Sequence, residues 1–306
     1  MSEYAILFDT SKCTACKGCQ VACKCWNNLP SPIEHNACAD NFTGTYQNPP
    51  DLDGDTRLIM TFNEDYADNN KGIKWGFGRR SCQHCSDPGC VKVCPAGAIY
   101  KDEETGMVTV DDSKCIGCQR CSMACPYDVP RYYGPKGKIN KCTGCVDRIK
   151  HGMKPACVAT CQPNALTFGE RDAMIEVANK RVEFLKERGY ADAMVYGEQE
   201  MGGLHVIQVL KYGIDFHGQV RDPEVPATAV LSEIMKPVAA VGMGATVVGL
   251  AAMFGLAAGY KRDKLVYNEA TTDTLSTDTG DVVKQGDPQD GRSFKEALTG
   301  KGADHE

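Results

Sequence analysis

Eighteen cysteines, all between Cys13 and Cys161, constrain this chain more than any other sequence feature. A chain of 306 residues is long enough to bury a core of its own, so it does not depend on disulfides as small secreted domains do. The cysteines are also clustered rather than evenly spread. We therefore expect the thiols to bind metal, and we expect the cysteine-free remainder of the chain to have a different role.

The cysteines form an internal repeat. Residues 8–23 and 110–125 are identical at eight of sixteen positions, including all four cysteines of each segment. Two further segments, 82–94 and 142–161, keep the CxxC start and the CxxxC end but have a longer middle. Sixteen cysteines belong to these four groups, and two are left over.

The spacing CxxCxxCxxxC is that of bacterial ferredoxins. Its first three thiolates ligate one iron–sulfur cluster, and the fourth points to the neighbouring cluster. Pro95 and Pro126 directly follow the last cysteine of the two middle groups, whereas the outer groups have Lys24 and Gln162 there. Zinc ribbons built from CxxC pairs are the alternative, but zinc sites rarely use this run, so the spacing favours iron–sulfur clusters.

Because each fourth cysteine crosses over, the groups must pair, the middle two with each other and the outer two with each other. We therefore expect four [4Fe–4S] clusters, whose iron is held by four sets of cysteines, numbered quartets I to IV. Quartet I is Cys13, Cys16, Cys19 and Cys161; quartet II is Cys23, Cys142, Cys145 and Cys157; quartet III is Cys82, Cys85, Cys90 and Cys125; quartet IV is Cys94, Cys115, Cys118 and Cys121. Cys25 competes with Cys23, which the spacing favours, and Cys38 is expected to be a plain thiol.

The repeat predicts an α+β fold with two interleaved ferredoxin-like [4Fe–4S] halves, related by a pseudo-twofold repeat, over residues 1–170. Short strand-like runs at equivalent places beside the groups support it. These runs are residues 5–8, 98–100, 108–110 and 165–168. The parts of the domain are the paired outer segments 1–38 and 140–170, the inner segment 80–139, and an insertion at 39–79.

One lysine or arginine stands near each cysteine group. These residues are Lys12, Arg80, Lys114 and Lys141. A cluster with four thiolate ligands carries negative charge, so a nearby cation would stabilise it and raise its potential. The alternative is that these side chains are ordinary solvated surface charges, and the sequence leaves both interpretations open.

Residues 171–235 predict a helix–strand extension and linker. An amphipathic helix is expected over 171–188, because apolar residues recur there at helical spacing. Its apolar stripe is Met174, Val177, Ala178, Val182 and Leu185. A strand is expected over 204–210. His205 and His217 are candidate metal ligands, but isolated histidines in such places are usually structural.

Residues 236–262 predict a single transmembrane helix. The 24 residues from 237 to 260 carry no charge, and about 20 apolar residues suffice to span a bilayer. A buried core helix is the alternative, but this length without a polar break favours the membrane. Ala251, Gly255 and Gly259 form a small-xxx-small spine, which permits close packing on another membrane helix.

The residues beside the span predict its orientation. Lys261, Arg262 and Lys264 follow it, whereas one lysine lies close before it. The positive-inside rule then places the C-terminus in the cytoplasm and the cluster domain on the outer, periplasmic side of the inner membrane. We see no signal peptide, so export would depend on a signal-bearing partner. The acidic tail, residues 263–306, is expected to be disordered.

The chain resembles the iron–sulfur (β) subunit of membrane-bound formate dehydrogenases of the molybdopterin family, over residues 4–264. The cysteine runs alone would fit many four-cluster electron carriers. Other stretches narrow the resemblance, and they are TYQNPPDL, RVEFLKERGYADAMVYGEQEMGGLHVIQVL and KPVAAVG, which opens the membrane span.

The resemblance implies an electron-transfer subunit without a catalytic site of its own. A partner subunit with a molybdenum or tungsten pterin would oxidise formate to CO2 in anaerobic respiration. Electrons would pass singly through the four clusters to a haem b membrane subunit, which the small-residue spine would face, and then to quinone.

Two other kinds of function compete with this one. The equivalent subunit of a membrane-bound hydrogenase, or of a sulfur or N-oxide reductase, shares the cluster motifs. A zinc-ribbon binding module is the alternative from another class. A nucleic-acid partner is disfavoured because the net charge is −6.

Overall fold

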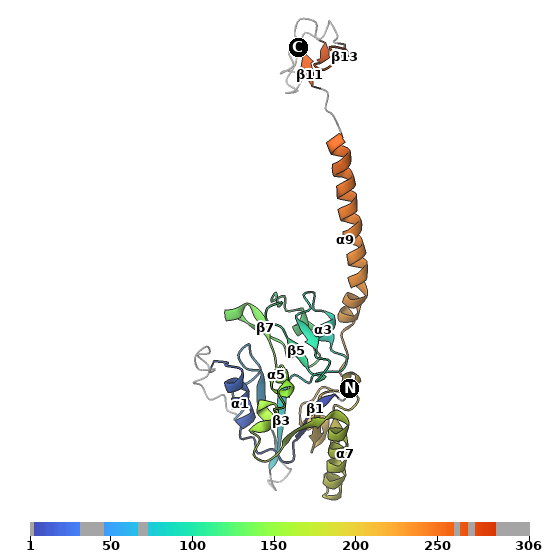
Figure 1. Cartoon of the computed structure of the whole chain (residues 1–306). Coiled ribbons are helices and arrows are strands. Elements are labelled where there is room, and N and C mark those ends of the chain that lie inside the picture. Colours follow the sequence, from blue (N-terminus) through green and yellow to red (C-terminus); the bar gives the residue numbers. More distant parts are fainter. Residues whose placement is uncertain (1–2, 31–45, 67–72, 260–263, 269–272, 286–306) are drawn as a thin grey trace, which may run out of the picture. The chain divides into compact units, whose positions relative to one another are not determined.

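The structure is a computed structural model, shown in Figure 1. It describes residues 3–30, 46–66, 73–259, 264–268 and 273–285. The expected plain thiol, Cys38, lies outside them. Contacts divide the chain into two compact units, Met1–Lys236 and Pro237–Glu306. The first unit therefore contains both the expected cluster domain and the extension that follows it.

A four-stranded sheet in the order β8-β1-β10-β9 organises the first unit. Its strands are β1 (Tyr4–Asp9), β8 (Leu166–Glu170), β9 (Met194–Tyr196) and β10 (Val206–Leu210). Strand β1 runs antiparallel to β8 and parallel to β10, and β10 runs antiparallel to β9. The runs predicted at 5–8 and 165–168 are thus neighbouring strands, although they lie at opposite ends of the cysteine-rich region.

The two central strands are buried on both faces, which explains their nearly continuous apolar sequence. Alternate residues point to opposite faces of a strand. Ala5 and Leu7 of β1 pack with helix α7 (Arg171–Glu187), whereas Ile6 and Phe8 pack in a cluster that contains Cys19, Cys23 and Cys157. One face of the sheet therefore supports the cysteines and the other is covered by α7.

Helix α7 confirms the helix expected over 171–188, but one member of the expected stripe is wrong. Ala178, Val182 and Leu185 are buried against the sheet. Val177 is 46% exposed, because the buried stripe is narrower than the sequence pattern suggested.

Three antiparallel hairpins complete the cluster region. They are β2–β3 (Leu58–Tyr66 and Ile73–Ser81), β4–β5 (Ile99–Lys101 and Val108–Val110) and β6–β7 (Arg131–Tyr133 and Lys138–Asn140). The β4–β5 hairpin matches the strands predicted between the two middle cysteine groups. The expected insertion supplies β2 and most of β3, so it is a structural part of this unit.

Short helices carry or follow many of the cysteines. They are α1 (Gly18–Trp26), α3 (Gly89–Lys92), α4 (Arg120–Met123), α5 (Val146–Lys150) and α6 (Ala156–Ala159). Helices α1 and α6 pack together, as do α3 and α4. The 3₁₀ helices η2 (Gly134–Lys136) and η3 (Glu200–Gly202) and helix α8 (Gly213–Phe216) lie in connecting segments.

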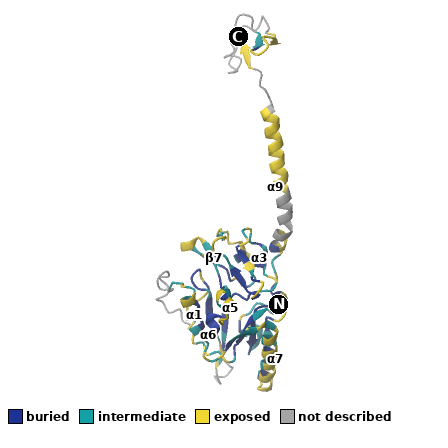
Figure 2. Ribbon diagram, viewed as in Figure 1, coloured by how far each residue is buried: buried dark blue, intermediate teal, exposed yellow. Residues whose placement is uncertain are grey.

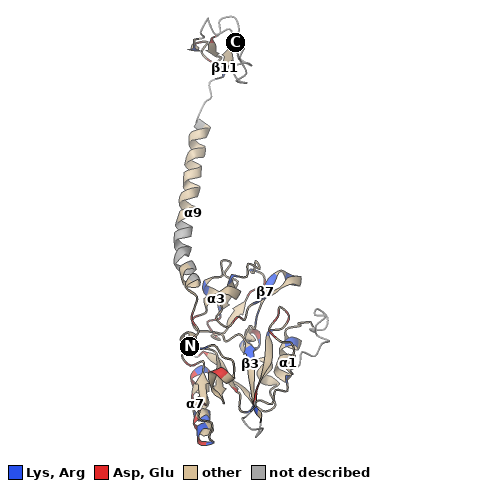
Figure 3. Cartoon of the chain, turned by 180° about the vertical axis from the view of Figure 1, so that it is seen from behind, with Lys and Arg blue, Asp and Glu red and all other residues tan. Residues whose placement is uncertain are grey.

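Helix α9 (Ala227–Gly259) has 33 residues and covers most of the expected span. From 242 to 258 its residues are exposed, as Figure 2 shows, and uncharged, as Figure 3 shows. Within the described ranges, no helix combines the length and the apolar character needed to cross a membrane.

The expectation of a wholly disordered tail is wrong for part of it. Three short strands form an antiparallel sheet in the order β11-β12-β13. They are β11 (Leu265–Tyr267), β12 (Thr274–Ser276) and β13 (Val282–Lys284). Each contains Val, Leu or Tyr, residues that favour strands. Residues 286–306 lie outside the described part of the chain.

Candidate metal centres

The four CxxC segments share one local backbone conformation. In each, the residue directly before the second cysteine has a positive φ. These residues are Ala15 (53°), His84 (50°), Gly117 (71°) and Gly144 (68°). The common left-handed residue turns the chain tightly between the two cysteines. The repeat seen in the sequence is therefore also a repeat of backbone geometry.

Quartet I surrounds one pocket. All four of its cysteines line that pocket, together with apolar residues such as Phe8, Met60 and Leu166. The backbone N–H of Ala15 donates to Cys13 Sγ at 3.4 Å, and that of Leu166 donates to Cys161 Sγ at 3.3 Å. Such N–H···S bonds stabilise thiolate charge, as iron–sulfur ligation requires.

Quartet IV surrounds a second pocket of the same kind. All four of its cysteines line it, beside Ile99 and Ile139. The N–H of Ala98 donates to Cys94 Sγ at 3.2 Å, and the N–H of Ile139 donates to Cys115 Sγ at 3.5 Å. The two pockets therefore have the same all-cysteine donor set, and in each a backbone N–H donates to two of the four cysteines.

The cysteines of quartets II and III lie deeper in the unit. The thiolates with the largest effects on the pKa of Cys23 are those of Cys142, Cys157 and Cys145. For the pKa of Cys85 they are those of Cys82, Cys125 and Cys90. In both quartets the charges that act most strongly on one cysteine thus come from the other three.

Burial raises the pKa of these thiols. It raises the pKa of Cys13 and Cys125 to about 11 and that of Cys19 and Cys145 to about 12. A buried thiol with a raised pKa stays protonated at neutral pH unless a cation replaces its proton. All-thiolate ligation of iron would supply that cation, so the residues fit the expected clusters.

Adjacent quartets meet in a fixed sequence. Cys19 of quartet I interacts electrostatically with Cys157 of quartet II. Cys82 of quartet III interacts in the same way with Cys142 of quartet II, and Cys90 of quartet III with Cys121 of quartet IV. The spatial order is therefore I, II, III, IV, which the cysteine spacing alone does not provide.

The leftover cysteine of the first group has a different environment from its neighbour. Cys23 is buried on the inner side of α1 and packs in the core with Cys157. Cys25 is exposed. Because α1 points only one of them inwards, burial supports Cys23 as the member of quartet II.

The basic residues named from the sequence divide into two kinds. Lys12 and Lys114 are well exposed, and each pairs with an aspartate three residues earlier. Arg80 pairs with Asp51 at 2.7 Å. Lys141, by contrast, is only 2% exposed. These positions look alike in the sequence, and only their tertiary environment separates them.

Sequence reasoning missed Arg79, which is 1% exposed. It selected Arg80, the next residue of β3. Successive strand residues point to opposite faces, so only one of the two enters the core. Arg79 lies opposite the buried Met60 in the β2–β3 ladder. Burial lowers the pKa of Arg79, but four cysteine thiolates, led by Cys157, raise it above the ordinary value.

The two histidines singled out from the sequence make structural hydrogen bonds. His205 Nδ1 lies 2.7 Å from the carbonyl oxygen of His84, and its Nε2 lies 2.9 Å from Glu3 Oε2. His217 Nε2 lies 3.5 Å from Thr10 Oγ1. In the described part of the chain, no three His, Cys, Asp or Glu side chains gather closely enough to hold a single metal ion.

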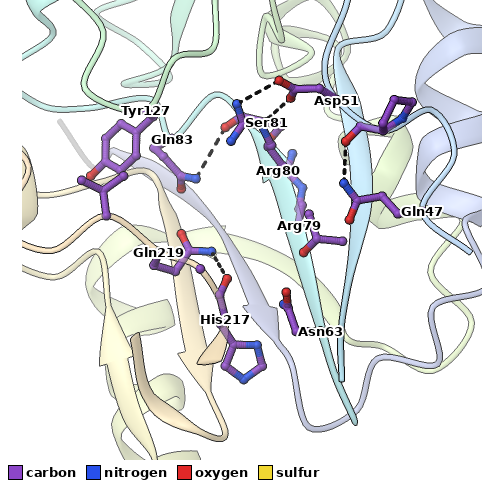
Figure 4. Close-up of a pocket in the computed structure, with 14 residues that line it drawn as sticks. Gln47, Asp51, Asn63, Arg79, Arg80, Ser81, Gln83, Tyr127, His217 and Gln219 are labelled. Carbon is purple, nitrogen blue, oxygen red and sulfur yellow. Dashed lines mark hydrogen bonds and ion pairs between the residues drawn. The ribbon is translucent and has the colours of Figure 1, made fainter. Parts of the chain in front are cut away.

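A polar cavity of about 380 Å³ lies beside the quartets and is shown in Figure 4. Residues of the β2–β3 hairpin line it, including Asn63 and Arg79, together with His217 and Gln219 from the loop after α8. Its lining contains no cysteine. The guanidinium nitrogens of Arg79 are themselves buried, so this side chain forms part of the wall between the cavity and the cysteines.

The repeated cysteine loops, the all-thiolate pockets and the N–H···S bonds define an iron–sulfur protein of the ferredoxin type. Residues 73–171 match the model of a 4Fe-4S dicluster domain. The chain is 39% identical over 253 residues to the nitrate-inducible formate dehydrogenase iron-sulfur subunit of Escherichia coli K12, covering 81% of this chain and 83% of the relative. The chain belongs to the family of formate dehydrogenase iron–sulfur subunits.

Two other relatives are similar to this chain, one of the same kind and one from another reductase. The formate dehydrogenase-O iron-sulfur subunit of E. coli K12 is 40% identical over 248 residues, which cover 80% of each chain. The B subunit of the anaerobic dimethyl sulfoxide reductase of E. coli K12 is 38% identical over 173 residues, 56% of this chain and 76% of the relative. This protein is therefore a non-catalytic electron-transfer subunit with four [4Fe–4S] clusters.

Proposed function

We propose that this chain passes single electrons along quartets I to IV, between a molybdopterin subunit that oxidises formate and a haem b membrane subunit that reduces quinone. The spatial order of the quartets carries the proposal, because a cysteine of each quartet interacts electrostatically with a cysteine of the next. The clusters supply one-electron redox chemistry, and the protein holds and orders them. Cys16 of quartet I and Cys118 of quartet IV are exposed, so the two terminal sites can approach partner subunits.

The start of α9 indicates which end faces the membrane subunit. Ala229, near the start of α9, is buried against Val93 and Ala124. These two residues directly precede Cys94 of quartet IV and Cys125 of quartet III. The first turn of α9 thus packs beside quartets III and IV, which supports a membrane subunit at that end. In this proposal quartet I faces the catalytic subunit and is the entry site for electrons from formate.

We also propose that α9 spans the inner membrane, with its C-terminus in the cytoplasm and the cluster unit on the periplasmic side. Support comes from the uncharged sequence of residues 237–260 and from exposed apolar side chains such as Met243, Val247 and Phe254. Alkaline carbonate washing should leave the chain in the membrane pellet. Protease should cut the tail in inside-out vesicles but not in right-side-out vesicles, and the reverse result would overturn the orientation.

The function is tested on the complex purified anaerobically from detergent-solubilised membranes. Formate-dependent reduction of viologen should co-purify with this chain. Formate should also reduce the clusters of the intact complex, as seen by electron paramagnetic resonance. A brown complex that retains its large subunit but has no formate activity would contradict the assignment.

A second candidate is the equivalent subunit of a sulfur or N-oxide reductase. The 38% identity to the B subunit of the dimethyl sulfoxide reductase favours it as the next choice. The same preparation would then oxidise reduced viologen when dimethyl sulfoxide or trimethylamine N-oxide is added. We expect no such activity, because the formate dehydrogenase relatives match a much larger share of this chain.

A further inference from the structure

Three lysines occupy the same position in the cysteine repeat, directly before the first cysteine of a group: Lys12, Lys114 and Lys141. Two of them pair with an aspartate three residues earlier. The distances are 3.8 Å from Lys12 to Asp9 and 3.4 Å from Lys114 to Asp111. The third has a lysine, Lys138, in place of that aspartate. Lys141 therefore lacks the local partner that holds the other two at the surface.

Lys141 instead points into the core beside Cys82 of quartet III. Its Nζ donates to the carbonyl oxygen of Val108 at 2.5 Å and to that of Cys142 at 2.9 Å, and it lies 3.9 Å from Cys82 Sγ. No carboxylate of the described residues forms an ion pair with it. Carbonyl groups solvate the ammonium but do not neutralise its charge.

Arg79 occupies the corresponding place between quartets I and II. Its strongest charge interactions are with Cys157 and Cys142 of quartet II, followed by Cys19 of quartet I. Its three guanidinium nitrogens are buried and form no well-aligned hydrogen bond within the described ranges. Among the described residues, Arg79 and Lys141 are thus the buried cations that adjoin the cysteines, and they lie beside quartets II and III.

A buried cation without a carboxylate partner is costly unless another negative charge lies beside it. The only negative groups that adjoin these two cations in the described unit are thiolates of quartets I to III. A cluster becomes more negative when it accepts an electron, so a nearby cation favours its reduced form and raises its potential. Quartet IV differs, because its nearest lysine, Lys114, is exposed and paired with Asp111.

We propose that Arg79 and Lys141 are potential-setting residues that make the clusters of quartets II and III more easily reduced than the cluster of quartet IV. The inference rests on the cluster assignment of the proposed function. Lys141 lies beside Cys82 of quartet III, whereas Arg79 interacts most strongly with Cys157 and Cys142 of quartet II. The two cations therefore raise the potential inside the relay rather than at its membrane end.

The test is a redox titration of the purified complex, followed by electron paramagnetic resonance. Lys141→Met should shift the reduction equilibrium of the cluster of quartet III at least tenfold towards the oxidised form, which is about 59 mV for one electron. Lys141→Arg should restore most of the shift, because it keeps the charge. Lys114→Met is the matched control and should move no cluster by more than twofold, since water and Asp111 already screen that charge.

Arg79→Gln tests the second cation independently and should shift the cluster of quartet II most. The cluster of quartet IV should move in neither of the two neutral variants. Unchanged titrations in variants with full iron content would overturn the proposal. If Lys141→Met loses iron, Lys141→Gln keeps N–H donors for the two carbonyls and is titrated in its place.

The wild-type complex separates this inference from the proposed function. Wild type that lacks four clusters, or whose clusters formate does not reduce, contradicts the proposed function before any variant is compared. If wild type passes both tests but the cluster potentials do not move in the variants, only the role of the two cations is contradicted.

Discussion

The Nε of Arg181 in α7 lies 2.8 Å from Oδ2 of Asp9, the last residue of β1. Asp9 is buried, and its Oδ1 also accepts the backbone N–H of Ser11 at 2.9 Å. Asp111 makes the same turn with Ser113 in the repeat, but among the described residues its ion pair is with Lys114. Helix α7, which lies beyond the last cysteine, therefore fixes the start of the first cysteine loop.

Replacing Arg181 by Met should destabilise the first unit by about 2 kcal/mol, because it leaves the buried Asp9 carboxylate without its main cation. The midpoint of anaerobic thermal unfolding measures the effect. Lys180→Met is the control, since Lys180 and its partner Glu176 are both exposed, and it should cost less than about 0.5 kcal/mol. Equal effects of the two substitutions would contradict a structural role for the Arg181–Asp9 pair.

The crossed pairing of the cysteine groups makes a specific prediction for serine variants. Cys161→Ser and Cys16→Ser should both alter the same cluster, because both residues belong to quartet I although they lie far apart in the sequence. Iron content and the paramagnetic resonance spectrum of the reduced complex report the change. Cys25→Ser should leave both unchanged. If Cys161→Ser altered the same cluster as Cys145→Ser instead, the groups would not cross over.

His217 makes stability depend on pH in one direction. Burial, together with nearby Lys74 and Lys211, lowers the pKa of His217 to about 4. The histidine stays neutral in the folded protein, whereas in the unfolded chain it takes up a proton below about pH 6.5. Its contribution to stability is therefore complete above that pH and declines as the pH falls towards 4.

When the pH is lowered from 7.5 to 5.5, the free energy of unfolding of wild type should fall by about 1 kcal/mol more than that of the His217→Asn variant. Anaerobic thermal scans at a fixed rate, at both pH values, measure the difference between the two proteins. His151→Asn removes an exposed histidine and is the control. If the stability of His217→Asn and that of His151→Asn depended on pH to the same extent, the assignment to His217 would be contradicted.

Much of the fold could be predicted because its signals are local. The cysteine spacing, the flanking strands and the helical period of α7 depend on residues a few positions apart. The partners of the strands could not be predicted in the same way. Strand β10 was expected, but its parallel pairing with β1 joins residues about 200 positions apart, as in Ile6 with Val206, and no short pattern records it.

The same limit applies to the candidate site. The cysteines of each quartet follow from spacing and crossover alone. The buried cations do not follow from the spacing. Lys141 and Lys114 each directly precede the first cysteine of a group, and Arg79 and Arg80 are neighbours on one strand. The lysine at position 138 is the one sequence signal that could have separated Lys141 from Lys114, since it removes the aspartate of the repeat.

The small residues of α9 give a prediction that separates packing within this chain from packing on a partner. Apart from its chain neighbours and the nearby backbone of the helix, no atom of the described chain lies within 4 Å of a Cβ built on Gly255 or Gly242, so a side chain at either position begins in open space. Gly255 belongs to the small-residue spine, whereas Gly242 lies on a different face of the helix. Gly255→Ile should therefore weaken association with the membrane subunit at least tenfold, while Gly242→Ile should not. Retention of the haem subunit on affinity-tagged protein measures the difference, and equal retention by both variants would show that the spine does not face that partner.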